Sequence, residues 1–285
     1  TRGIGKTLAK KLSELGAKLI IHGRDEKKVQ KLEDELRKFN PHVIGIKADL
    51  SNEDEVNEMF IKIKKNYPEV YALVNNASSI SGSRDLTSKD FKDWKKDMSV
   101  NIDSIFLLTN KLVNHMRDNS IKGRVINVSG YTAKSSSSLF NDGGNILSKS
   151  FIEKFSDILS EENYIHDIAI TTLRIDENIN TGAFTNLENI PIYGKKVKKA
   201  IEGITKYIAP EPEKLLPVFL YALRAPFHEI TGKVISSSAY LSNPKLSKIV
   251  PSYQIMLKDN IYNNLHPTKS NNYKDKDINY LVKQN

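Results

Sequence analysis

The sequence predicts a single α/β domain built on a doubly wound parallel sheet. Apolar runs of strand length alternate with longer segments whose apolar residues recur at helical spacing, and this alternation continues over most of the 285 residues. Such an order is typical of a parallel sheet with helices on both faces. The chain has no internal repeat and no cysteine, so disulfides, thiolate metal sites and cysteine nucleophiles are excluded.

The elements follow in order from the first residues. Three leucines recur at helical spacing over residues 4–16 and predict the first helix. Strands are expected at 17–23, 43–50, 71–77, 123–129, 168–175 and 232–237, and further helices at 26–39, 53–67, 88–118, 144–161 and 212–223. The domain is expected to cover residues 1–250, and the polar, aperiodic residues 251–285 are expected to form a loose tail.

Charge and composition argue against several partners. Lys and Arg outnumber Asp and Glu by 43 to 34, a net charge of +9, but no basic stripe is interleaved with aromatics, so no nucleic-acid partner is expected. The six histidines show no metal-ligand spacing, and no metal site is expected. No apolar run approaches the roughly 18 residues of a membrane span, so we expect no membrane contact and a cytoplasmic location. A targeting segment upstream of the first residue would not be visible in this sequence.

The stretch TRGIG opens directly into the first helix. Gly3 and Gly5 let backbone N–H groups approach a pyrophosphate, where the helix dipole favours negative charge. A GxG pair alone is common at helix starts, so its meaning depends on the motifs that follow it.

These motifs resemble the short-chain dehydrogenase/reductase family. TRGIG aligns with the end of that family's TGxxxGxG loop, which implies that Gly3, Ile4 and Gly5 bind a cofactor pyrophosphate and that the first glycine and first strand lie upstream. Because that strand would lie in the middle of the sheet, we expect this chain alone to be a fragment that is unstable or insoluble. The stretch IKADLS places Asp49 and Leu50 where the family binds adenine.

Two further motifs follow in the family's order. The stretch NNAS resembles the family's NNAG loop, with Ser78 at the glycine, and implies that Asn76 and Ala77 lie against the cofactor. Asn101 in MSVNIDSIF matches the helix asparagine with which the family supports a proton-relay water. The resemblance covers about residues 1–235 and implies a Rossmann-type domain that acts on a small-molecule carbonyl or alcohol.

The corner that follows the strand at 17–23 favours NADP over NAD. NAD enzymes usually place a carboxylate there that binds the ribose 2′-hydroxyl, whereas this chain has Arg24 at the corner and Arg2 beside the glycine turn. A planar, permanently charged guanidinium suits a 2′-phosphate. The alternative is that Asp25 binds the hydroxyl of NAD and Arg24 is a solvated charge.

The reacting end of the site departs from the family. The family uses a tyrosine as the acid and a lysine four residues later, YxxxK, because the ammonium lowers the pKa of the phenol and holds the nicotinamide ribose. The stretch NILSKSF matches this SK step at Ser148 and Lys149, which puts Asn145 at the tyrosine position. Tyr131 and Lys134 are spaced by three and follow the strand too closely, so they do not form this pair.

The turn after the strand at 168–175 departs as well. The family writes a PGxVxT-like turn that cradles the nicotinamide amide. Here Asp176 and Glu177 stand at the Pro and Gly positions, while Ile179 and Thr181 are kept. The resemblance therefore still implies that the backbone of Ile179 and the hydroxyl of Thr181 hold the amide.

The usual proton donors are thus missing. A carboxamide at the tyrosine position cannot donate a proton at neutral pH, and the family's catalytic serine falls on Gly130, preceded by Ser129. General acid catalysis contributes about 10² to 10⁴ in rate, so reduction should be weak unless another group replaces the phenol. The candidates are Tyr131, Asp176 and Glu177.

Two functions remain open on this evidence. The first is an NADP-dependent oxidoreductase of a small molecule, with residues 182–212 as a substrate lid. The second is a degenerate NADP-binding member with a sensing or scaffolding role. We expect a homo-oligomer in either case, with contacts through the apolar helix at 212–223 and the strand at 232–237.

Overall fold

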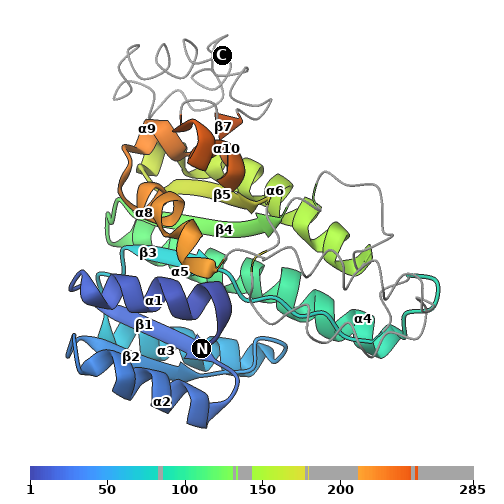
Figure 1. The fold of residues 1–285 in the computed structure, drawn as a ribbon, viewed down its shortest axis with the longest axis horizontal. Helices are drawn as coiled ribbons and strands as arrows, with labels where there is room; N and C mark the ends of the chain where they lie inside the picture. Colours follow the sequence, from blue (N-terminus) through green and yellow to red (C-terminus); the bar gives the residue numbers. More distant parts are fainter. Residues whose placement is uncertain are drawn as a thin grey trace.

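Strands and helices alternate along the chain, as the sequence predicts (Figure 1). The computed structural model describes residues 1–82, 86–130, 133, 143–176, 179, 211–244 and 248–249. The α-helices are α1 (Gly3–Glu14), α2 (Glu26–Arg37), α3 (Glu53–Asn66), α4 (Phe91–Met98), α5 (Ser104–Asp118), α6 (Gly143–Asn163), α8 (Leu216–Arg224), α9 (Phe227–Ile230) and α10 (Ser237–Ser242). The strands are β1 (Leu19–Gly23), β2 (Val43–Lys47), β3 (Ala72–Asn75), β4 (Arg124–Gly130), β5 (Ala169–Ile175), β6 (Val234–Ser236) and β7 (Lys248–Ile249).

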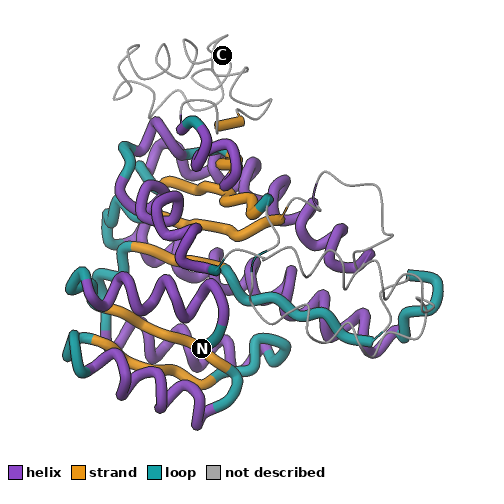
Figure 2. The backbone as a smooth tube through the Cα atoms, viewed as in Figure 1, coloured by secondary structure: helices purple, strands orange, loops and turns teal. Residues whose placement is uncertain are grey.

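The strands form two sheets. β1 and β2 pair in parallel, and β3, β4, β5 and β6 form a second parallel sheet in that order, with β7 antiparallel at its edge. Among the described residues, β1 and β3 are not hydrogen-bonded to each other, although the two sheets lie side by side (Figures 1 and 2). The architecture is the predicted α/β Rossmann-like fold in a single domain.

Polar caps decide where several helices begin. The predicted helix at 88–118 starts at Phe91 because the side chain of Asp90 accepts a hydrogen bond from the backbone N–H of Lys92 at 2.7 Å. A π-helical turn, η1 (Ser99–Asp103), then separates α4 from α5 without ending the helix. Such turns often mark functional sites, and this one carries Asn101.

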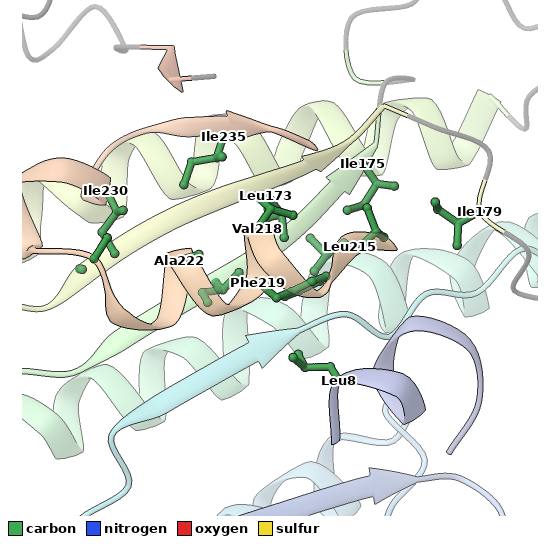
Figure 3. Close-up of a cluster of buried hydrophobic side chains, with 14 residues drawn as sticks. Leu8, Leu173, Ile175, Ile179, Leu215, Val218, Phe219, Ala222, Ile230 and Ile235 are labelled. Carbon is green, nitrogen blue, oxygen red and sulfur yellow. The ribbon is translucent and has the colours of Figure 1, made fainter. Parts of the chain in front are cut away.

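The main core lies between the larger sheet and the helices α1 and α8 (Figure 3). It contains Leu173 of β5, Phe219 of α8, which is 1% exposed, and Leu8 of α1. The apolar side of α8 therefore packs against the sheet. Most of the apolar side chains of this helix are used in the core, and Leu220 is half-buried outside it; the oligomer contact expected here stays a prediction.

The last part of the described chain differs from the prediction. The strand expected at 232–237 is reduced to β6, because the side chain of Ser236 accepts a hydrogen bond from the backbone of Ala239 and starts α10. The short strand β7 was not predicted. The expected tail and nearly all of the expected lid lie outside the described residues.

Candidate active site

The N-terminus of α1 and the end of β3 meet at one corner of the carboxyl edge. Gly3 starts α1 with φ of 51°, a left-handed conformation that favours glycine. A Cβ atom on Gly5 would lie 3.1 Å from the side-chain nitrogen of Asn76, which follows β3. The first-turn N–H groups of α1 have no intrahelical partner, so this corner can hold an anionic group. The predicted Gly3, Gly5 and Asn76 are brought together.

Arg24 and Asp49 lie near each other at the ends of β1 and β2. The Asp49 carboxylate accepts hydrogen bonds from the backbone N–H of Ser51 at 2.9 Å and from its hydroxyl at 2.8 Å. Burial alone would raise the pKa of Asp49, but these hydrogen bonds and the positive charge of Arg24 hold it below its ordinary value. Arg24 itself is exposed, and the half-buried Leu50 packs against the core beside β2.

Asn101 fixes the loop that follows β3. Its side-chain oxygen accepts from the backbone N–H of Ser79 at 2.7 Å and from the hydroxyl of Ser78 at 3.2 Å, and its nitrogen donates to the Ser79 carbonyl at 2.8 Å. Asn101 is 2% exposed. Because its side chain is engaged with Ser78 and Ser79, it can act on a reaction only by holding this loop or through its backbone.

A buried ion pair beside Asn101 was missed in the sequence. Lys89 and Asp97 lie 2.8 Å apart from nitrogen to oxygen, and both side chains are 2% exposed. In the sequence, this contact is indicated only by the position of Asp97, which lies four residues before Asn101 and therefore on the same helical face. A charge on an amphipathic helix is usually solvated, so the pattern alone did not point to this contact.

Lys149 lies at the carboxyl end of β4. Its ammonium donates a hydrogen bond to the backbone carbonyl of Val128 at 2.9 Å, and burial lowers its pKa from 10.5 to about 8. Asn145 lies one helical turn earlier on α6 and is half-buried, while Ser148 is buried and donates to the Gly144 carbonyl at 2.6 Å. Asn145 and Lys149 therefore lie one helical turn apart on α6, and their roles stay a prediction.

Ser129 is turned into the interface between β4 and α6. Its hydroxyl donates to Glu153 at 2.9 Å, and Glu153 in turn accepts two hydrogen bonds from Arg174 of β5, at 2.7 and 2.5 Å. The Arg174 side chain is 3% exposed. Ser129 thus belongs to a buried polar network in this structure, and its partners could not be predicted from the sequence.

Asp176 is also engaged with neighbouring residues. Its carboxylate accepts hydrogen bonds from the hydroxyls of Ser236 and Ser238, and its backbone N–H donates to Ser237 at 3.0 Å. These contacts join the end of β5 to the start of α10. The Asp176 carboxylate is therefore engaged with the serines of the β6–α10 segment.

The remaining predicted residues divide into two groups. Ile179 is 4% exposed and belongs to the same core cluster as Leu8 of α1 (Figure 3). Tyr131, Glu177 and Thr181 lie outside the described residues.

Within the described part of the chain, no group of three His, Asp or Glu side chains could hold a metal ion, and no helix is long and apolar enough to cross a membrane.

Comparisons with known proteins agree with this arrangement. A sequence model of the family described as short chain dehydrogenase matches residues 1–184. An NADP-dependent 3-hydroxy acid dehydrogenase of Salmonella typhi is 26% identical over 232 residues, which cover 80% of this chain and 88% of the relative. A 3-oxoacyl-[acyl-carrier-protein] reductase of Aquifex aeolicus is 30% identical over 133 residues, 45% of this chain and 52% of the relative.

Solved structures share the fold. A putative NAD(P)-dependent gluconate 5-dehydrogenase from Beutenbergia cavernae, with bound NADP, superposes with a TM-score of 0.72 at 18% identity, covering 85% of this chain and 94% of that one. A short-chain dehydrogenase/reductase from Mycobacterium marinum gives a TM-score of 0.71 at 19% identity, covering 85% and 92%.

Proposed function

The chain belongs to the short-chain dehydrogenase/reductase family, and from this premise we propose that it is an NADP-dependent oxidoreductase that interconverts a carbonyl and an alcohol. The relatives that match it are named as oxidoreductases, which favours turnover over a sensing or scaffolding role. A 3-hydroxy acid, the substrate named for the Salmonella relative, is one substrate class to test first.

The observation that carries this proposal is the position of the Lys149 ammonium. It lies 2.9 Å from the Val128 carbonyl, at the edge of the sheet where the first turn of α1 also opens. The ligands of doubly wound sheets bind outside this edge. A dinucleotide whose pyrophosphate lay at Gly3 to Gly5 would reach Lys149 with its nicotinamide ribose.

The residues at this edge fit such a cofactor. A Cβ on Gly5 would crowd the Asn76 side chain, so glycine lets the first turn of α1 lie close to the end of β3, and we assign the pyrophosphate to this corner together with Ile4 and Ala77. Asp49 and Leu50 would contact the adenine, and Lys149 the nicotinamide ribose. Bound NADPH would supply the hydride. The chain's own groups would orient the carbonyl and provide the proton.

Two arginines favour NADP over NAD. Arg24 follows β1 directly, and Arg2 precedes α1 in an extended conformation with no side-chain cap hydrogen bond. Two guanidinium groups at one corner suit a 2′-phosphate. Hydrogen bonds to charged groups contribute about 1.5–3 kcal/mol each, so Arg24→Ala should weaken NADPH binding by about 10- to 100-fold and leave NADH binding nearly unchanged.

A titration of the protein with NADPH and NADH, followed by nucleotide fluorescence, tests the cofactor assignment. Arg224→Ala, at the exposed C-terminal end of α8, is the matched control and should change neither affinity. Tighter binding of NADH than of NADPH by the parent would overturn the assignment to NADP.

The proton donor is the open part of the proposal. Asn145 cannot replace a phenol, and Asp176 and Ser129 are engaged as described. We therefore propose Tyr131 as the first residue to test, because it follows β4 directly. NADPH oxidation by the parent that disappears in Tyr131→Phe would support it, and unchanged turnover would exclude it.

The oligomeric state remains a proposal as well. The apolar side of α8 is used in the core, whereas Phe106 of α5 and Ile158 of α6 are each 50% exposed. We propose a homo-oligomer whose contacts involve these two helices rather than α8, and a cytoplasmic location. Sedimentation of the parent and of Phe106→Lys tests the first part. A monomeric parent would contradict it.

A further inference from the structure

The described residues that follow β3 lie near the phosphate corner and near the start of α6. At one end, the Asn76 side chain lies 3.1 Å from the position of a Cβ on Gly5. At the other end, the Leu86 side chain lies 2.5 Å from the position of a Cβ on Gly143, the first residue of α6. Residues 77–82 therefore lie between the pyrophosphate corner and the reacting end of the proposed site.

One buried ion pair holds the middle of this loop. The Asp97 carboxylate accepts hydrogen bonds from the Ser79 hydroxyl and the Ser81 backbone N–H, both at 2.9 Å. Its partner Lys89 donates to the Ser81 carbonyl, also at 2.9 Å. The pair thus fixes the side chain of Ser79 and both backbone groups of Ser81.

Asn101 completes the same arrangement from the next turn of the helix. It binds the backbone N–H and carbonyl of Ser79, so Asp97 and Asn101 together hold the loop along one helical face. This face includes the π-helical turn. The loop is therefore attached at Ser79 and Ser81 to a helix rather than to another loop.

Stability alone does not account for the pair. Taking two charges out of water is costly, and replacement of a buried ion pair by apolar side chains of similar volume is often neutral or stabilising. What an apolar pair cannot reproduce is the set of hydrogen bonds to Ser79 and Ser81. The specific contribution of Lys89 and Asp97 is therefore the position of the loop.

We propose that Lys89 and Asp97 are positioning residues that set residues 77–82 against the nicotinamide half of the cofactor. This inference rests on the proposed function, because it assumes that a nicotinamide dinucleotide occupies the edge. The adenosine half is bound elsewhere, by Arg24 and Asp49. Loss of the pair should consequently affect one half of the cofactor and not the other.

The test compares two ligands in the double variant Lys89→Met/Asp97→Leu, which removes both charges together. NADPH contains both halves of the cofactor, and adenosine 2′,5′-bisphosphate contains the adenosine half alone. Loss of the two hydrogen bonds from the loop to Asp97 should weaken NADPH binding by roughly tenfold or more. The affinity for adenosine 2′,5′-bisphosphate should stay within about twofold of the parent.

A second variant separates positioning from general loosening. Met116 lies fully buried at the far end of α5, so Met116→Ala should lower stability without changing the ratio of the two affinities. An unchanged ratio in the double variant, or an equal change in Met116→Ala, would overturn the inference. A parent that binds neither ligand would instead refute the proposed function, and the inference with it.

Amide hydrogen exchange on the unmodified protein covers the case in which the double variant does not fold. NADPH should slow exchange at Ser79 and Ser81, because it lies against the loop that carries them. Adenosine 2′,5′-bisphosphate should not. Equal protection by both ligands, or by neither while NADPH binds, would contradict the placement of this loop.

Discussion

Asn145→Tyr tests the assignment of α6 directly, because it restores a phenol where the family has one. Residues four apart on a helix have Cβ atoms about 5–6 Å apart on the same face, so the new hydroxyl would lie beside the Lys149 ammonium. That ammonium is held 2.9 Å from the Val128 carbonyl. Its charge would lower the pKa of the phenol and make it a better proton donor at neutral pH.

The expected size of the effect follows from the chemistry of the missing donor. General acid catalysis contributes about 10² to 10⁴ in rate, which corresponds to about 3–5 kcal/mol of barrier. If no other group supplies the proton, Asn145→Tyr should raise kcat for NADPH oxidation by a factor approaching this range. The affinity for NADPH should change little, because position 145 does not bind the phosphates.

The assay is NADPH oxidation with a panel of aldehydes, ketones and 3-oxo acids. Asn145→Phe is the matched control, since it adds the ring without the hydroxyl, and it should stay at the parent rate. Lys149→Met in the tyrosine background should remove the gain. Equal rates in the parent and in both ring variants would refute the placement of residue 145 at the reacting end.

Two further predictions concern stability. Burial lowers the pKa of Lys149 from 10.5 to about 8, so the folded protein loses this proton before the unfolded chain does. The free energy of unfolding should therefore rise, by at most about 3 kcal/mol, from pH 8 to pH 10.5. Lys149→Met should lack this rise when both proteins are unfolded in urea. The same pH dependence in the parent and in Lys149→Met would contradict the burial of the ammonium. Glu153→Gln should cost about 3–5 kcal/mol because it leaves the buried charge of Arg174 without a counter-ion. In the same urea assay Asp167→Asn, which breaks an exposed pair with Lys122, should cost about 1 kcal/mol or less, and a similar cost for both would contradict the network.

The fold was predictable because its signals are local. Helical spacing and apolar runs predict the order of strands and helices. For example, β4 and β5 pair in parallel, and each contains an apolar run that predicts a strand from its own residues alone. The exceptions are also local in origin. Asp90 and Ser236 are helix caps. Because of Asp90, α4 begins later than the apolar pattern predicts, and because of Ser236, β6 ends earlier than that pattern predicts.

The polar contacts of the site were not predictable in the same way. Lys149 could be found from its neighbours in sequence, but the partners of Ser129 come from α6 and β5 and depend on how these elements pack. Lys89 and Asp97 are charged residues of a kind that is usually solvated. Only the folded chain shows that both are buried.

The apolar side of α8 illustrates a different limit. An amphipathic helix predicts that one face is covered, and it does not say whether a sheet or a second subunit covers it. Phe219 is buried within this chain, whereas Leu216, Leu220 and Leu223 of the same helix are half-buried. The exposed Phe106 and Ile158 leave the question open for α5 and α6.

A crystal structure of the protein with NADPH is the most direct test of the account. We expect the Lys149 ammonium within hydrogen-bond distance of the nicotinamide ribose hydroxyls and the reactive carbon of the ring facing Asn145. A nicotinamide that lies away from α6, with the ammonium still bonded only to Val128, would contradict the assignment on which the proposed chemistry depends.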